Sequence, residues 1–232
     1  MDNIYFYKPD GKFKYLNKVR LWVVAQLVDR VDEKKRIRKW MRPLWGAALN
    51  QKGIVIYVSR LDAEISALNL KRSGEQWKVY SLDDFNIREM MIDCKNLTGN
   101  DKYHFLFSFG FWVNDNGNLT NKKGWLSQTL YVNTFTVNEN IESEEQIIIN
   151  FDHEIIKSIF NVWNNKIPSM PEYERYLEKI NQYDSAYIES QAINALNSIE
   201  KDTEQVRPPD IAAIWNPTES KWIYTNPNNS IN

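Results

Sequence analysis

The middle of the chain constrains the fold most strongly, because it carries one strand-like apolar segment after another with turn signals between them. Each segment is rich in aromatic or β-branched residues, or alternates apolar with polar ones, as half-buried strands do. The helices that fit between the central segments are too short to serve as parallel crossovers, so we expect antiparallel pairing. The predicted strands are Gly53–Arg60, Ala63–Leu70, Trp77–Leu82, Tyr103–Val113 and Trp125–Val137.

On both sides of this region, apolar residues recur at helical spacing. This spacing predicts one helix over residues 16–27, where a strand stays open because the segment is rich in β-branched residues, and another over Ile37–Leu44. A shorter helix is predicted at Asp83–Cys94, and two more run from Asp152 to Asn164 and from Pro171 to Glu204. We therefore expect an α+β fold, with a curved antiparallel sheet from the central region packed against N- and C-terminal helices.

Composition supports a single large core. Apolar residues make up 43% of the 232 residues and include nine Trp, which excludes intrinsic disorder as a description of the whole chain. We expect a single α+β domain over residues 1–205 and a C-terminal tail over residues 206–232. Two Trp-containing segments of the tail flank Asn216-Pro217, which predicts a hairpin over Ile211–Tyr224. Because exposed Trp side chains are unfavourable, we expect this hairpin to dock on the domain.

Cysteine content and apolar run lengths bear on the compartment. The single cysteine, Cys94, excludes an intramolecular disulfide and a Cys-based structural zinc site, which fits a reducing compartment. The N-terminal sequence does not resemble a secretory signal. The longest apolar runs fall far short of the ~20 residues that span a bilayer. We therefore expect a cytoplasmic protein with no membrane partner.

The residues needed for common catalytic and cofactor sites are scarce. None of the eight glycines forms a G-x-G or G-x-x-x-x-G-K pattern, so phosphate-binding loops have no support. The two histidines, His104 and His153, do not form the H-E-x-x-H zinc motif. We interpret Asp152, His153 and Glu154 as a helix start, and Cys94 as a small buried side chain. We assign no catalytic residue, metal site or cofactor, and we favour a protein without enzymatic activity.

Charge is unevenly distributed along the chain, although the net charge is −1. Residues 1–60 contain 14 Lys or Arg and 5 Asp or Glu, whereas the remaining residues contain 15 and 25. Seven of the cations lie within residues 30–42. Such a chain can neutralise itself across an internal interface, or can present a basic face to an anionic partner.

On a helix, the basic segment 30–42 has the geometry of a phosphate-binding surface. Lys35, Arg38, Lys39 and Arg42 follow the i, i+3, i+4, i+7 spacing and would share one face, with Trp45 available to stack on a base. The alternative is a solvated surface helix, or one paired with acidic residues of the 172–178 region. The alternative is favoured because nucleic-acid-binding domains usually carry a net basic charge, and this chain does not.

Three functional hypotheses follow, and no resemblance to a known family chooses among them. The first is a non-catalytic protein-interaction module, such as an inhibitor, an immunity-type protein or an accessory protein of a phage or other mobile element. It is favoured because catalytic motifs are missing, while aromatic and Arg residues, which dominate protein interfaces, are abundant. The second is nucleic-acid binding through the basic helix. The third is an enzyme of unrecognised type, starting from residues 152–154, Cys94 and His104. The oligomeric state stays open.

Overall fold

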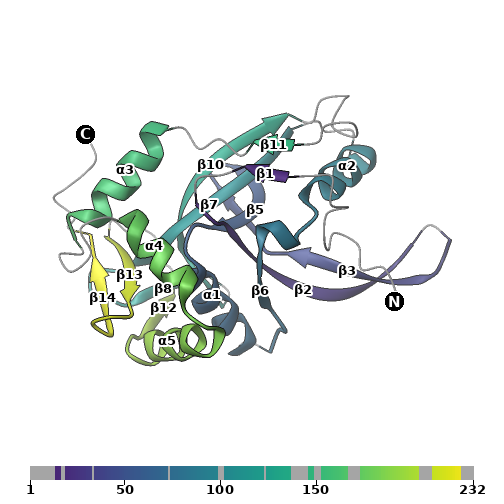
Figure 1. Ribbon diagram of the computed structural model, residues 1–232. Coiled ribbons are helices and arrows are strands. Elements are labelled where there is room, and N and C mark those ends of the chain that lie inside the picture. The colour runs from purple at the N-terminus through teal and green to yellow at the C-terminus, as the bar shows by residue number, and fades with distance from the viewer. Residues whose placement is uncertain are drawn as a thin grey trace.

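A large, open, mixed sheet organises the chain (Figure 1). The computed structural model describes residues 14–16, 19–32, 34–72, 74–98, 102–122, 124–136, 146–148, 153–166, 173–203 and 211–225. Within these residues, twelve strands join in one sheet, and β1 and β11 form a separate pair. The strands are β1 Lys14–Leu16, β2 Trp22–Val31, β3 Ile37–Pro43, β4 Trp45–Ala48, β5 Gln51–Tyr57, β6 Lys78–Ser81, β7 Lys102–Val113, β8 Leu119–Lys122, β9 Trp125–Leu126, β10 Gln128–Thr136, β11 Gln146–Ile148, β12 Lys201–Thr203, β13 Ile211–Asn216 and β14 Lys221–Tyr224.

The main path of the sheet runs β12-β8-β7-β5-β2-β3, and β10 and β13 also pair with β7. β5 and β7 are parallel neighbours, as are β12 and β8, whereas β2 pairs antiparallel with β3, β5 and β6. The expectation of a wholly antiparallel sheet is therefore wrong. The connection from β5 to β7 contains two helices as well as β6, and is long enough for a parallel crossover.

Six helical segments accompany the sheet within the described residues. They are α1 Arg60–Arg72, the 3₁₀ turn η1 Leu82–Asp84, α2 Ile87–Thr98, α3 His153–Asn164, α4 Tyr173–Gln182 and α5 Ser185–Asn197. The long C-terminal helix predicted from Pro171 is divided in two, because Asp184 caps α5: its Oδ1 accepts a hydrogen bond from Tyr187 N at 2.7 Å. None of the described helices is long and apolar enough to cross a membrane.

Other secondary-structure predictions also differ from the structure. The helix predicted over Ile37–Leu44 is wrong, because residues 37–43 are β3, and of the two conformations left open for residues 16–27 the strand is found from Trp22 onward, in β2, so the sheet does not pack against N-terminal helices there. Trp22–Gln26 are all buried, so both faces of β2 are apolar at this end and the sequence shows no alternation. Conversely, Ala63–Leu70, predicted as a strand, belongs to α1, which buries polar as well as apolar side chains.

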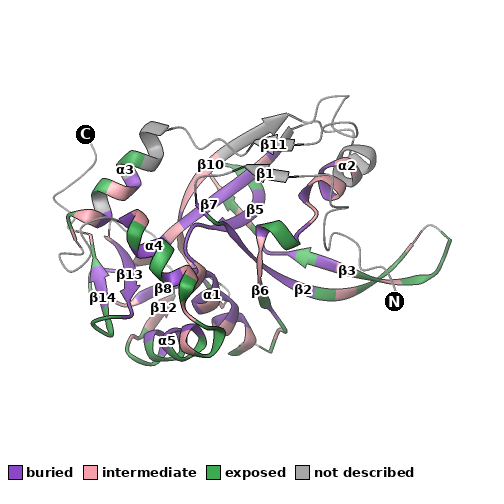
Figure 2. Cartoon of the chain, viewed as in Figure 1, coloured by how far each residue is buried: buried purple, intermediate pink, exposed green. Residues whose placement is uncertain are grey.

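The core lies on both faces of the central strands. On one face of β5 and β7, Val55, Tyr57 and Leu106 pack with small residues of α1. On the opposite face, Phe105 and Phe107 belong to the larger apolar cluster. Figure 2 shows this burial along β5 and β7, and shows β2 changing from buried to exposed along its length.

The C-terminal segment pairs directly with the main sheet. β13 and β14 form an antiparallel hairpin in which Trp215 lies opposite Trp222, and β13 also pairs with β7. Trp215 is 1% exposed; its Nε1 donates to Gln191 Oε1 at 3.0 Å, and its carbonyl oxygen accepts from Tyr176 Oη at 2.8 Å. These contacts hold the hairpin against α4 and α5.

Candidate functional site

Strands β2 and β3 form a two-stranded ribbon that projects from the body, visible at the right of Figure 1. β2 pairs with β5 and β6 only over Trp22–Ala25, so from Gln26 onward β3 is its one partner within the described residues. Burial ends at the same point, because Leu27–Val31 are exposed or half-buried. We call residues 26–42 the arm.

Asp32 organises the tip of the arm. Its Oδ1 accepts hydrogen bonds from Lys34 N at 2.9 Å and Arg36 N at 2.8 Å, and its Oδ2 accepts from the Arg36 side chain at 2.9 Å. Arg38 Nε approaches the same oxygen at 3.5 Å. Chiefly through the backbone hydrogen bond from Arg36, the pKa of Asp32 is lowered to about 2. One carboxylate therefore fixes both the turn and two guanidinium groups.

One face of the arm combines arginine with tryptophan. Side chains alternate between faces along a strand, so Arg38, Trp40 and Arg42 of β3 share a face with Gln26 and Arg30 of β2. The Arg30 guanidinium lies 4.6 Å from the centre of the Trp40 ring. In the amide orientation that satisfies both groups, Gln26 Oε1 accepts from Arg42 Nε at 3.0 Å. We call this the arginine face.

Arg42 is held from a second side. Its guanidinium lies 5.7 Å from the centre of the Trp77 ring, which is buried beside the root of the arm. The arginine face therefore carries guanidinium groups whose positions are restrained by aromatic rings, an amide and, for Arg38, a carboxylate. Such restraint reduces the conformational entropy cost of binding an anion.

The opposite face of the arm is apolar apart from one ion pair. Leu27, Val31 and Ile37 are 49%, 63% and 72% exposed, and Val31 lies directly opposite Ile37 near the tip. Between them, Lys39 Nζ lies 2.6 Å from Asp29 Oδ1. We call this the apolar face.

The structure separates the residues that the sequence grouped on one helical face. The helix over residues 30–42 is wrong, because the segment is a turn followed by a strand. Lys35 lies in the turn with φ of 59°, Arg38 and Arg42 lie on the arginine face, and Lys39 lies on the apolar face. Trp45 lies outside the arm on β4, 39% exposed, with its ring edge-on to Tyr103 at 6.0 Å.

The helical interpretation missed residues of the candidate site that a strand interpretation finds. Arg30 and Trp40 join the arginine face only when the two strands pair, and Asp29 and Asp32 supply the acidic partners. The signal available was the alternation from Ile37 to Arg42, in which Ile37, Lys39 and Met41 alternate with Arg38, Trp40 and Arg42. Asp29 and Asp32, which pair with Lys39, Arg36 and Arg38, lie within the arm itself.

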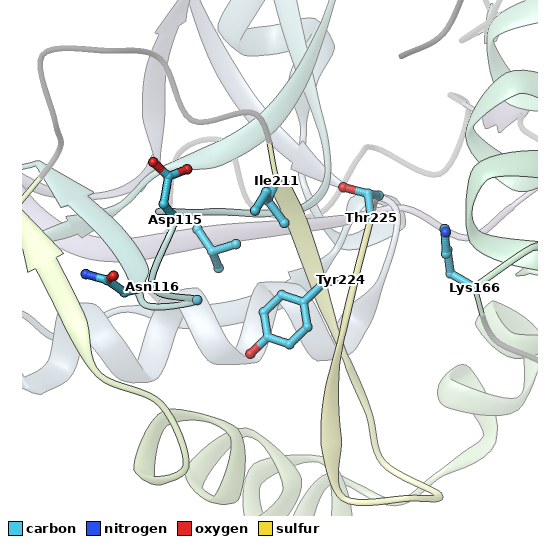
Figure 3. Close-up of a pocket in the computed structure, with 8 residues that line it drawn as sticks. Asp115, Asn116, Lys166, Ile211, Tyr224 and Thr225 are labelled. Carbon is cyan, nitrogen blue, oxygen red and sulfur yellow. The ribbon is translucent and has the colours of Figure 1, made fainter. Parts of the chain in front are cut away.

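A second candidate is a pocket of about 500 Å³ beside the C-terminal hairpin (Figure 3). Asp115 and Asn116 reach it from the turn between β7 and β8, Lys166 from the end of α3, and Tyr224 from β14. Asp115 and Lys166 provide one charge of each sign on separate walls (Figure 3). The described lining residues can hold a small polar molecule, but they include no pairing of a nucleophile with a base.

Of the residues proposed as starting points for an enzyme, the structure describes the side chain of His104 alone. His104 lies on β7 and is half-buried. The side chains of Cys94, His153 and Glu154, and the whole of Asp152, lie outside the described residues. Among the residues that the structure describes, no group of three or more His, Cys, Asp or Glu side chains could hold a metal ion.

Comparison of the chain with protein-family models, with curated proteins and with solved structures finds no match. The geometry of the arm is therefore the main indication of function.

Proposed function

We propose that this protein binds nucleic acid through the arm. The observation that carries the proposal is the arm itself: a two-stranded ribbon that leaves the body and places Arg30, Arg38 and Arg42 on one face (Figure 1). Phosphate contacts from Lys and Arg supply most of the affinity of nucleic-acid-binding proteins. A guanidinium can also bind one phosphate or one guanine edge through two hydrogen bonds.

The net charge of −1 does not oppose this proposal, because the relevant quantity is the local field. Seven of the 29 cations lie within residues 30–42, and the turn places Lys34 and Lys35, both exposed, at the tip. The ion pairs on the arm neutralise part of this charge: Asp32 bonds Arg36 and Arg38, and Asp29 bonds Lys39. The remaining cations outnumber the acidic residues of the arm.

A matched pair of charge-reversal variants tests the proposal. Arg38→Glu with Arg42→Glu changes two cations of the arginine face, and Lys52→Glu with Lys157→Glu makes the same charge change at two exposed positions off the arm. Binding of a fluorescent oligonucleotide is measured by anisotropy across a salt series. The arm variant should bind at least ~10-fold more weakly than the wild type at each salt concentration, since each bidentate contact that is lost is worth about 1–3 kcal/mol, while the control should bind like the wild type. Equal binding by all three proteins would contradict the proposal.

The apolar face supports a second candidate, the protein-interaction module. Val31 and Ile37 form a cross-strand pair that is mostly exposed, which is unusual for large aliphatic side chains near each other on a projecting element. A protein partner on this face should be recovered in stoichiometric amount by the wild type and by the arginine-face variant. It should not be recovered with Val31→Ser and Ile37→Ser, and recovery with that variant would exclude the face as its binding site.

A further inference from the structure

We infer that the nucleic acid bound by the arm is duplex DNA, with the ribbon lying in the major groove and the arginine face towards the bases. This inference rests on the proposed function and adds the class of ligand. Three features of the arm carry it: the width of the ribbon, the covered faces of its tryptophan rings, and the restrained positions of its guanidinium groups.

The dimensions of the arm match the major groove of B-form DNA. Neighbouring strands lie about 5 Å apart, so a ribbon of two strands is about 10 Å across, and the groove is about 12 Å wide. The register from Ala25–Pro43 to Val31–Ile37 is continuous, so the ribbon carries no bulge that would broaden it. From Gln26 to Val31 the arm extends roughly 16 Å, which is about half a turn of the duplex. A duplex of A-form RNA has a deep, narrow major groove that does not admit such a ribbon.

The tryptophan rings argue against a single-stranded ligand. Proteins that bind single strands stack bases on open aromatic faces. The Arg30 guanidinium covers Trp40 on the arm, and the Arg42 guanidinium lies over Trp77, which is buried beside the root of the arm. A base could stack on either covered ring face only after displacing a cation that the phosphates of the same strand also attract. The rings therefore position guanidinium groups instead of serving as a stacking surface.

The guanidinium groups are arranged along the groove direction. Arg38 and Arg42 lie on the same face of β3, four residues and about 13 Å apart, and Arg30 lies directly opposite Arg38. Gln26 orients the guanidinium group of Arg42, and Asp32 orients that of Arg38. Oriented forks suit bidentate contacts to guanine O6 and N7 at the groove floor, and Lys34 and Lys35 at the tip would meet phosphates at the groove edge.

The test compares three fluorescent probes of one sequence, about two helical turns long: a DNA duplex, its single strand and the corresponding RNA duplex. The full-length protein should bind the DNA duplex at least ~10-fold more tightly than either other probe, a ratio within the range of one or two bidentate base contacts. Dimethyl sulfate should find guanine N7 protected in the complex, since that atom lies in the major groove. Arg30→Ala should weaken duplex binding by a similar factor, while Lys39→Ala, which removes a cation from the apolar face, should change it less.

The outcomes distinguish failure of the duplex-DNA inference from failure of the proposed nucleic-acid binding. Tighter binding to the single strand than to the DNA duplex by the wild type would overturn the inference and leave nucleic-acid binding intact. Equal affinity for the DNA and RNA duplexes, or an unprotected guanine N7, would overturn insertion into the major groove. Failure to bind any of the three probes would overturn both.

Discussion

Asp62 is a buried carboxylate whose replacement should stabilise the protein in a pH-dependent way. It lies in the first turn of α1, is 1% exposed, and neither carboxylate oxygen has a hydrogen-bond partner among the described residues. Burial raises its pKa from 3.8 to about 7. The folded state therefore retains a proton that the unfolded chain releases between those two values. Stability consequently falls as the pH rises through this window.

The expected change in the free energy of unfolding follows from the pKa shift of Asp62 and from the opposing interaction of its charge with the N-terminus of α1. Each pKa unit corresponds to about 1.4 kcal/mol, so a shift of about three units gives a ceiling of ~4 kcal/mol. The N-terminus of α1 favours a negative charge in the first turn, by up to ~2 kcal/mol in a buried setting. We therefore expect Asp62→Asn, which removes the charge at nearly constant volume, to raise the free energy of unfolding by about 2–4 kcal/mol at about pH 8.

Urea unfolding of the wild type and of Asp62→Asn, each at about pH 4 and about pH 8, measures this difference. The gain should be present at the higher pH and should shrink to roughly 0.6 kcal/mol at the lower one, where the carboxyl is protonated in the folded state and only about half ionised in the unfolded chain. Asp115→Asn, which removes an exposed carboxylate, should show no such dependence and serves as the control. If Asp62→Asn lowered the free energy of unfolding equally at both pH values, the reasoning would be refuted. That result would mean that the Asp62 side chain stabilises the fold through a contact that does not depend on its charge.

Three further changes test individual contacts. Tyr176→Phe removes the hydroxyl that donates to Trp215 O at 2.8 Å, and the buried carbonyl left unpaired should lower the free energy of unfolding by about 1–3 kcal/mol, measured in urea. Gly53→Ala would place a methyl group against the His104 backbone where β5 and β7 pair, and should cost about 3 kcal/mol or prevent folding; a wild-type melting temperature would contradict this packing. Asp32→Asn should speed amide hydrogen exchange at the tip and leave the rest of the chain unchanged. In the wild type, the contribution of Asp32 is present above pH 3.8 and lost as the pH falls through about 2, so tip exchange in the variant should lack that acid-dependent change.

The arm shows how a candidate site can be recognised in the sequence although its geometry is predicted wrongly. The basic cluster was visible because charge is a property of composition, and Arg38 and Arg42 do share a face. The cluster satisfied a helical template because Lys35, Arg38, Lys39 and Arg42 recur at helical spacing. Only pairing with β2 brings Arg30 over Trp40. No local pattern contains that pairing, since it joins residues across a turn.

Helix α1 shows the opposite error. The segment Ala63–Leu70 alternates apolar and polar residues, which predicts a strand, but its polar side chains Ser66 and Asn69 are buried together with its apolar ones. Asn69 donates to Gly124 O at 2.7 Å and accepts from Lys201 Nζ at 2.8 Å, partners that are distant in sequence. A helix covered on most sides does not show the apolar stripe by which amphipathic helices are identified.

The sequence alone determined those elements that are marked by a run of aromatic or β-branched residues of strand length or by turn residues. The aromatic strand β7, the strand β5 and the hairpin of β13 and β14 belong to this group. Tertiary structure decided the rest: the parallel pairing of β5 with β7, the ribbon of β2 and β3, and the helical state of α1. In each of these cases the local pattern of apolar and polar residues does not identify the conformation or the pairing partner. The conformation then depends on which distant segments satisfy the backbone and side-chain hydrogen bonds, and that information is not carried by any short stretch of the chain.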